Sequence, residues 1–194
     1  MVESKVKKRK VAWGITGAGD KIAEIIEVMK DLKKQSEDVV EIDVFLSKAA
    51  ETMLKFYRLD DDLRQNFAKI TVELNSNSPF LAGMVQSHKY EFLLIAPASS
   101  NTVAKIVNSI SDTLLTNSAL MSLKAFVPVW IMPVDFKESI IYTKLPNGKE
   151  MKLRVRKEEA DQVRKLEAME DVHVFENPAK MREGFLEWLK TVNN

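Results

Sequence analysis

The sequence predicts an α/β fold, a Rossmann-like doubly wound and mainly parallel sheet, on three observations. Short apolar runs alternate with segments of helical periodicity, which is the pattern of successive βαβ units. The first apolar run passes into a turn that contains Gly14, Gly17 and Gly19, and a central run passes into the small polar residues 99–102. Because parallel strands end at one edge of their sheet, both segments are expected to border a ligand crevice there.

The other elements follow from the same two periodicities. Strands are predicted where apolar and β-branched residues form short runs, at 11–15, 39–46, 92–96, 127–132 and 172–175. Helices are predicted where apolar residues recur every three or four positions, at 22–32, 49–57, 81–87, 102–109, 114–123, 158–169 and 181–189. The segment 59–78 has no clear period, and only a short strand around Val72 and Leu74 is expected in it.

A C-terminal β-hairpin arm is predicted at about 138–156. Residues 139–145 and 151–156 flank Pro146-Asn147-Gly148, and the Asn-Gly pair favours a hairpin turn. The arm and the sheet are expected to form one domain, 1–194, because a chain of this length with 45% apolar residues can bury one sizeable core.

Composition excludes several classes of function. The formal net charge is +1, so no overall field favours nucleic acid or an acidic membrane, and neither is a predicted partner. The chain has no cysteine, which excludes disulfides, thiol nucleophiles and Cys-ligated iron–sulfur clusters, and no metal site is predicted. No apolar run is long enough to span a bilayer or to form a signal peptide. The expected location is therefore the cytoplasm.

The ends of the first two predicted strands favour a monophosphate ligand. The glycines from Gly14 to Gly19 let a phosphate approach backbone N–H groups, but their spacing is neither that of a P-loop nor that of a dinucleotide-binding fingerprint. The second strand ends at Ser47, where a NAD-binding domain would place an acid to hold the ribose. A hydroxyl there suits a phosphate, and it can also cap the next helix.

Several segments carry a resemblance to a known superfamily. Pro97-Ala-Ser-Ser-Asn-Thr102 resembles the PASANT motif of the flavoproteins that include the FMN-binding cysteine decarboxylases, with Ser100 in place of the usual Ala. Residues 101–106 and 111–116 continue that resemblance, with Thr113 where Asn is usual. The turn 14–19 resembles the G-x-T-G-A-S loop of the same proteins, with Gly19 in place of Ser. The resemblance implies FMN, bound non-covalently at the carboxyl edge of the sheet.

The resemblance also implies which residues contact the cofactor. The turn and Ser47 would contact the phosphate and ribityl chain, and residues 99–102 the ribityl chain and ring. Trp130 and Met132, on a strand that borders the crevice, would either touch the ring or pack in the core. The full set of predicted cofactor-binding residues is Gly14, Thr16, Gly17, Ala18, Gly19, Ser47, Ala98, Ser99, Ser100, Asn101, Thr102, Trp130 and Met132. No side chain is predicted to act as a catalytic acid, base or nucleophile.

Two departures from the superfamily argue against a cysteine decarboxylase. The position that matches the decarboxylases' catalytic His is Gly83, and the nearby His88 is interpreted as an exposed residue at a helix end. The decarboxylases' P-A-M-N-x-x-M-W segment is replaced by residues 132–136, Met-Pro-Val-Asp-Phe. The substrate-handling elements are therefore missing, whereas the flavin-holding elements remain.

A narrower resemblance, to archaeoflavoprotein A and the related dihydromethanopterin reductases, covers nearly the whole chain through residues 11–20, 28–30, 129–135 and 145–148. It implies an electron-transfer flavoprotein that accepts electrons from reduced ferredoxin, with an unknown acceptor. It also implies a homo-oligomer, a trimer or a multiple of trimers. Two alternatives stay open: a flavin-dependent reductase of a pterin-like or other small substrate, and a non-redox prenyltransferase that uses FMN as a scaffold.

Overall fold

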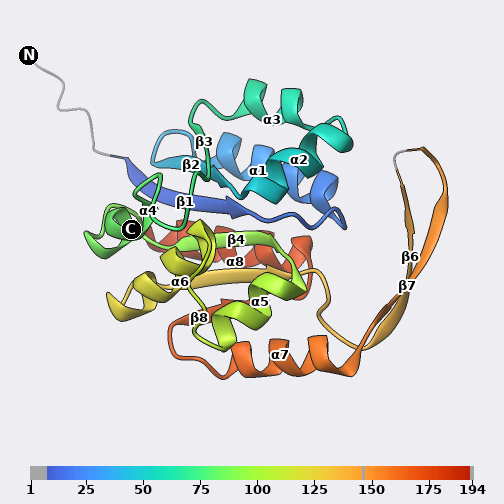
Figure 1. The fold of residues 1–194 in the computed structure, drawn as a ribbon. Helices are drawn as coiled ribbons and strands as arrows, with labels where there is room; N and C mark the ends of the chain where they lie inside the picture. Colours follow the sequence, from blue (N-terminus) through green and yellow to red (C-terminus); the bar gives the residue numbers. More distant parts are fainter. Residues whose placement is uncertain (1–7, 146, 193–194) are drawn as a thin grey trace, which may run out of the picture.

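The computed structural model describes residues 8–145 and 147–192, and a six-stranded sheet with the order β3-β2-β1-β4-β5-β8 forms its centre (Figure 1). The strands are β1 (Arg9–Ile15), β2 (Val40–Leu46), β3 (Ile70–Val72), β4 (Leu93–Ala98), β5 (Val129–Pro133) and β8 (Val172–Val174). Every pairing within this sheet is parallel. The predicted fold class is therefore confirmed.

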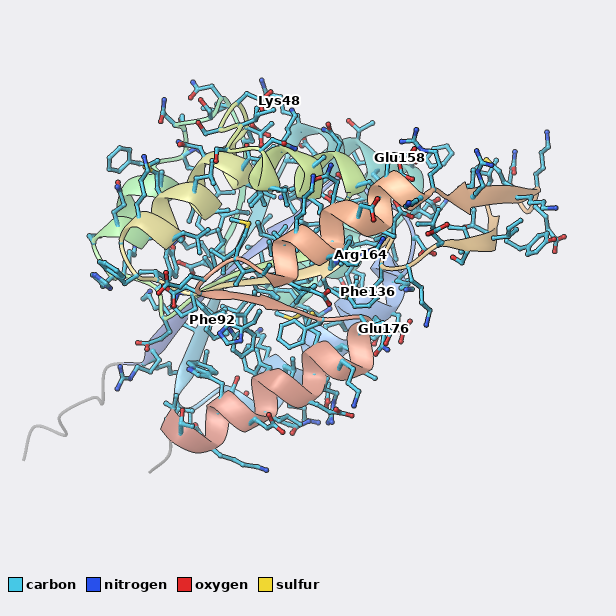
Figure 2. All side chains as sticks on the ribbon, turned by 90° about the horizontal axis from the view of Figure 1, so that it is seen from below. Lys48, Phe92, Phe136, Glu158, Arg164 and Glu176 are labelled. Carbon is cyan, nitrogen blue, oxygen red and sulfur yellow. The ribbon has the colours of Figure 1, made fainter. Side chains whose placement is uncertain are left out.

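Helices cover both faces of the sheet, and each face has its own apolar core. One core is shared with α1 (Ile22–Ser36), α2 (Lys48–Phe56), α3 (Asp60–Asn66) and α8 (Pro178–Val192). The other is shared with α4 (Leu81–Gln86), α5 (Ser100–Val107), α6 (Leu114–Lys124) and α7 (Lys157–Glu167). Figure 2 shows α7 and α8 on opposite sides of the sheet. Successive residues of the central strands, such as Ala12 and Trp13, alternate between the two cores, as the pleat requires.

The segment 59–78 contains more structure than the sequence predicts. Helix α3 is missing from the prediction because it is short, although three consecutive aspartates occupy its first turn, where they suit the helix dipole. The buried Leu63 and Phe67, four residues apart, fix it to the core. The short strand is present as β3, but Leu74 lies beyond its end and is 67% exposed.

The predicted hairpin arm is confirmed as β6 (Ser139–Lys144) and β7 (Glu150–Val155), which pair antiparallel in a separate two-stranded sheet. Gly148 has a φ of 83°, which glycine adopts without strain, and its N–H donates to the carbonyl of Leu145 (2.8 Å). Pro146 of the predicted turn lies outside the described residues. Figure 1 shows the arm projecting away from the central sheet.

Candidate functional site

The sheet has its topological switch point between β1 and β4. Strand β1 pairs with β2 on one side and with β4 on the other, and β4 pairs onward with β5. The chain therefore winds in opposite directions from this pair, which opens a crevice at the carboxyl ends of both strands. The glycine turn (residues 14–20) follows β1 and the polar segment 99–102 follows β4, so the structure brings the two predicted segments together.

Thr16 joins these two segments. Its hydroxyl donates to the carbonyl of Pro97 (2.7 Å) and accepts from the backbone N–H of Ser99 (3.0 Å). Its own N–H donates to the same Pro97 carbonyl (3.3 Å). Thr16 is buried, and its hydroxyl is already used within the protein. The structure therefore gives it the role of fixing the turn against the end of β4, and its predicted contact with the cofactor stays a prediction.

The glycine turn presents unused backbone donors. Within the described residues, the N–H groups of Gly17, Ala18 and Gly19 donate to no acceptor, and these residues are exposed or half-buried. Consecutive free N–H groups at the end of a strand form a concavity suited to an anion. A Cβ added at Gly17 would lie 2.6 Å from the Cβ of Ala49, so glycine is needed there for packing as well. This donor set fits the phosphate monoester of the predicted cofactor.

Serine hydroxyls cap the helices that begin at the crevice. Ser47 precedes α2 and accepts from the N–H of Ala50 (3.0 Å), and Ser99 precedes α5 and accepts from the N–H of Thr102 (3.3 Å). The predicted capping role of Ser47 is confirmed, and its contact with a ligand stays a prediction. Ala98 is fully buried, and its carbonyl accepts from the N–H of Val134 (3.1 Å).

Ser100 and Asn101 differ in their availability to a ligand. The Ser100 hydroxyl donates to the carboxylate of Asp135, which follows β5. The Asn101 side chain is exposed and makes no hydrogen bond to any described residue. Asp135 was missed at the sequence level, although its place directly after a strand could have indicated it. An open pocket of about 340 Å³ adjoins Ser100 and Asn101, and Arg156, Glu158 and Gln162 at the start of α7 form its other side.

The structure gives three other predicted residues packing roles. Trp130 is 7% exposed and stacks on Phe92, with 4.1 Å between ring centroids, and Met132 is fully buried in the same core. Gly14 lies within β1, and a Cβ there would approach the Leu115 side chain to 2.6 Å. The core interpretation that the sequence left open for Trp130 and Met132 is thus the one that their burial favours.

The position of the decarboxylases' histidine, Gly83, lies beside the exposed side chain of Phe80. Gly83 lies in α4, and a Cβ added there would come within 1.9 Å of the Phe80 ring, so a larger residue requires Phe80 to move. His88 is exposed beyond the end of α4 with a φ of 53°, as the sequence predicts for a helix-end residue. Neither residue supplies a proton-transfer group to the crevice.

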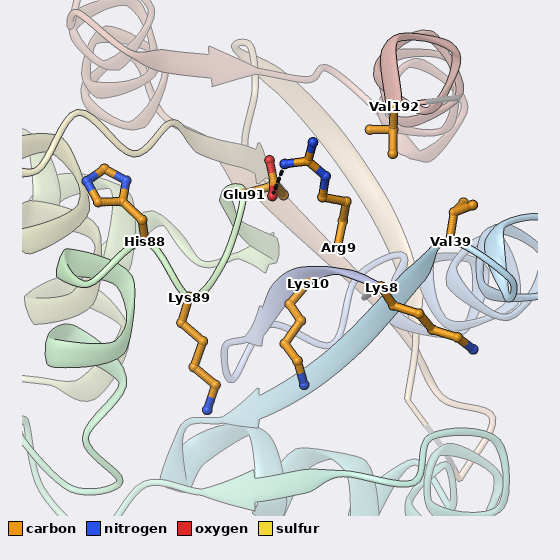
Figure 3. Close-up of a pocket in the computed structure, with 8 residues that line it drawn as sticks. All are labelled: Lys8, Arg9, Lys10, Val39, His88, Lys89, Glu91 and Val192. Atoms are coloured by element: carbon orange, nitrogen blue, oxygen red, sulfur yellow. Dashed lines mark hydrogen bonds and ion pairs between the residues drawn. The ribbon is translucent and has the colours of Figure 1, made fainter. Parts of the chain in front are cut away.

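A larger cavity lies at the other edge of the sheet, and it does not belong to this site. It has a volume of about 720 Å³ and is lined by the amino end of β1, by residues 88–91 and by Val192 at the end of α8 (Figure 3). Half of its lining residues are Lys or Arg, of which Arg9 is paired with Glu91 (3.0 Å) and Lys10 with Glu41 (2.7 Å). The glycine turn is at the carboxyl end of β1, so the two features are separated by the length of the strand.

The fold and the turn define a class: an α/β protein with an anion-binding loop at the switch point of a parallel sheet. The chain matches the Flavoprotein family model over residues 1–184. It is 41% identical to an uncharacterised protein of Methanocaldococcus jannaschii, over 93% of this chain and 96% of that protein. It is 32% identical to dihydromethanopterin reductase (acceptor) of the same organism, over 91% of this chain and 95% of that protein.

A solved structure agrees with these sequence matches. Burkholderia xenovorans DmrB in complex with FMN, described as a cubic protein cage for redox transfer, aligns with a TM-score of 0.81 at 32% identity, over 96% of this chain and 98% of DmrB. The chain belongs to the Flavoprotein family, which confirms the predicted superfamily. Among the described residues, no helix is both long enough and apolar enough to cross a bilayer.

Proposed function

We propose that this flavoprotein binds FMN non-covalently at the carboxyl ends of β1 and β4 and transfers electrons through it. The observation that carries the proposal is the set of free N–H groups at Gly17, Ala18 and Gly19, placed at the switch point of the sheet. A single anion-binding turn suits the one phosphate of FMN. The DmrB structure contains FMN, in agreement with the predicted cofactor.

The protein's own residues have three tasks in this proposal. The glycine turn and Ser47 bind the phosphate, residues 99–102 bind the ribityl chain and ring, and Thr16 holds the two groups in register. When bound, the flavin supplies one- and two-electron redox chemistry, whereas the protein supplies orientation and the surrounding charge. Asn101 can both donate to and accept from a heterocycle edge through its unused amide.

We further propose that reduced ferredoxin is the electron donor. The arm, residues 139–156, carries five Lys or Arg residues and one Glu, whereas the whole chain has a net charge of only +1. The remainder of the chain is therefore net negative, and positive charge is concentrated on the projecting arm (Figure 1). Lys149, Lys152 and Arg154 are exposed there, whereas Arg156 at the end of the arm is paired with Glu159. Ferredoxins are usually acidic, so such an arm suits them as partners.

Anaerobic stopped-flow reduction of the FMN-loaded protein tests this donor. Reduced ferredoxin should reduce the flavin rapidly, and the rate should fall steeply as salt is raised, because electrostatic steering is screened. NADH and NADPH should react slowly, since the turn lacks a dinucleotide fingerprint. Fast reduction by NAD(P)H with none by ferredoxin would contradict the proposed donor.

A second candidate function, reduction of a small pterin-like substrate, is favoured by the pocket beside Asn101. Its amide and guanidinium lining offers donors and acceptors to a polar heterocycle. The 32% identical M. jannaschii protein is named dihydromethanopterin reductase (acceptor). Turnover of a dihydropterin by the reduced protein, measured by absorbance, distinguishes this function from electron transfer alone.

We also propose that the chain forms a homo-oligomer, a trimer or a multiple of trimers. DmrB is described as a cubic cage, and the arm of this chain exposes apolar side chains, among them Ile140 and Tyr142, that an isolated two-stranded hairpin does not bury. Light scattering coupled to size-exclusion chromatography measures the mass. A monomer at micromolar concentration would contradict this proposal.

A further inference from the structure

A buried carboxylate, that of Glu73, lies at the same edge of the sheet as the glycine turn. Glu73 directly follows β3 and is 8% exposed, and its N–H donates to the carbonyl of Leu46 (2.8 Å), which extends the pairing with β2. One side-chain oxygen, Oε1, accepts from the N–H of Leu114 (2.8 Å). The other, Oε2, accepts from the N–H of Lys48 (3.3 Å). One side chain therefore reaches two backbone donors that are far apart in the sequence.

Those two donors are the first residues of two helices that lie on opposite faces of the sheet. Lys48 begins α2, which packs in the core shared with α1 and α8, and Leu114 begins α6, which packs in the other core. Each helix start carries free N–H groups and partial positive charge. A single buried carboxylate satisfies one donor of each and compensates both charges, so Glu73 ties the two helix starts together across the edge of the sheet.

The two helix starts enclose β1 and the glycine turn. Ala49 in the first turn of α2 lies against Gly17, where an added Cβ would be 2.6 Å away. Leu115 in the first turn of α6 lies against Gly14, where an added Cβ would also be 2.6 Å from the side chain. A shift of either helix start would therefore move a residue that contacts the β1 end or its turn.

Glu73 also limits where an anion can bind. It occupies the N–H groups of Lys48 and Leu114, so neither is available to a phosphate. The N–H groups of Gly17, Ala18 and Gly19 donate to no described residue and remain available. The protein's own carboxylate thus directs an incoming phosphate to the glycine turn and away from the first residues of α2 and α6.

We propose that Glu73 is a positioning residue for the phosphate of the cofactor. By holding the starts of α2 and α6 at a fixed separation, it keeps Ser47 and the glycine turn in the arrangement that accepts a phosphate monoester. This inference rests on the proposed function, since it concerns the phosphate end of the same site. It assigns Glu73 no contact with the reacting ring.

Comparing FMN with riboflavin, which lacks the phosphate, tests this role. Dissociation constants for both flavins would be measured by fluorescence quenching for the wild type, Glu73→Gln and the matched control Glu51→Gln. Glu51 lies in the first turn of α2 and forms an ion pair with Lys55 (3.1 Å). Glu73→Gln should weaken FMN binding roughly tenfold, because the amide cannot accept from both N–H groups, and should change riboflavin binding much less. Glu51→Gln should leave both constants near the wild-type values.

Glu73→Asp provides a second variant if the Gln protein folds poorly. It keeps the charge but is one methylene shorter and cannot span both helix starts, so it should also lose FMN affinity selectively. A parallel loss for both flavins, no loss, or tighter FMN binding in the Gln variant would overturn the positioning role. If the wild type itself binds FMN no better than riboflavin, the proposed phosphate site fails instead, and the two failures are thereby distinguished.

Discussion

The sequence predicts ligand contact for both Ser47 and Asn101, but the two side chains differ in their hydrogen bonds within the protein. The Ser47 hydroxyl caps α2, whereas the Asn101 amide is exposed and makes no hydrogen bond to a described residue. We therefore expect a substitution at Ser47 to affect both stability and binding, and one at Asn101 to affect binding alone.

Ser47→Ala and Asn101→Ala should each weaken FMN binding. Losing a hydrogen bond to the charged phosphate costs roughly 1.5–3 kcal/mol, so Ser47→Ala should weaken affinity about tenfold to a hundredfold. It should also lower the free energy of unfolding by ~1 kcal/mol through the lost cap. Asn177→Ala, which removes the side-chain cap at the start of α8, is the matched control: it should lose stability but keep its affinity. Unchanged flavin titrations for both Ala variants would mean that the site lies elsewhere.

Asp43 is the clearest buried charge outside the crevice, and Tyr90 holds it in place. Asp43 is fully buried in β2, pairs with Lys69 and accepts from the Tyr90 hydroxyl (2.7 Å). Burial opposes ionisation of the Asp43 carboxyl, but the hydrogen bonds from Lys69 and Tyr90 outweigh it and hold its pKa below the ordinary value of 3.8. Burial, followed by the bond to Asp43, raises the pKa of Tyr90.

Tyr90→Phe should lower the free energy of unfolding by roughly 1.5–3 kcal/mol at neutral pH, because it removes a hydrogen bond to a buried charged group. The depressed Asp43 pKa stabilises the fold above pH 3.8 and ceases to do so as the pH falls through the folded-state pKa. The difference between variant and wild type should therefore shrink in acid. Urea unfolding at several pH values measures it, with Tyr142→Phe on the exposed arm as the control. A difference that stays constant as the pH falls well below 3.8 would contradict this account.

At the scale of elements, the sequence predicts what depends on local pattern. The strands, most helices, the glycine turn after β1 and the Asn-Gly hairpin all have local signals, and the structure contains them. Glu73 and the hydrogen bonds of Thr16 have no local signal, because each depends on partners from another part of the chain. Trp130 shows the same limit, since its place on a strand near the crevice leaves ring contact and core packing open and does not reveal that it stacks on Phe92.

Substitutions in the arm test the proposal that ferredoxin is the electron donor. Reversing the charge of Lys152 and Arg154 to Glu should lower the rate of reduction by ferredoxin about tenfold at low ionic strength, because steering depends on local charge. The difference should disappear at high salt. A double variant with the same charge change, Lys34→Glu and Lys124→Glu on α1 and α6, should react like the wild type. If both double variants lost the same fraction of the reduction rate, the arm would not be part of the docking surface.

At the scale of the whole molecule, the flavoprotein scaffold is present, and we expect it to lack decarboxylase activity. Gly83 carries no proton-transfer group, and Phe80 occupies the space beside it. General acid–base help is worth about 10²–10⁴-fold in rate, so carbon dioxide release from peptidyl-cysteine should remain near background. A radiometric or coupled assay measures the release. Turnover at ordinary enzymatic rates would show that another group supplies the proton transfer.

The identity of the bound cofactor tests the central claim most directly. The purified protein, reconstituted with a mixture of FMN, FAD, riboflavin and NAD and then desalted, would be denatured and the released compounds separated by chromatography. The account predicts a yellow protein that releases FMN, because the glycine turn at the β1–β4 switch point offers one phosphate site and Ser47 replaces the acid that an adenosine ribose would need. Release of FAD or NAD, or of no chromophore at all, would contradict it.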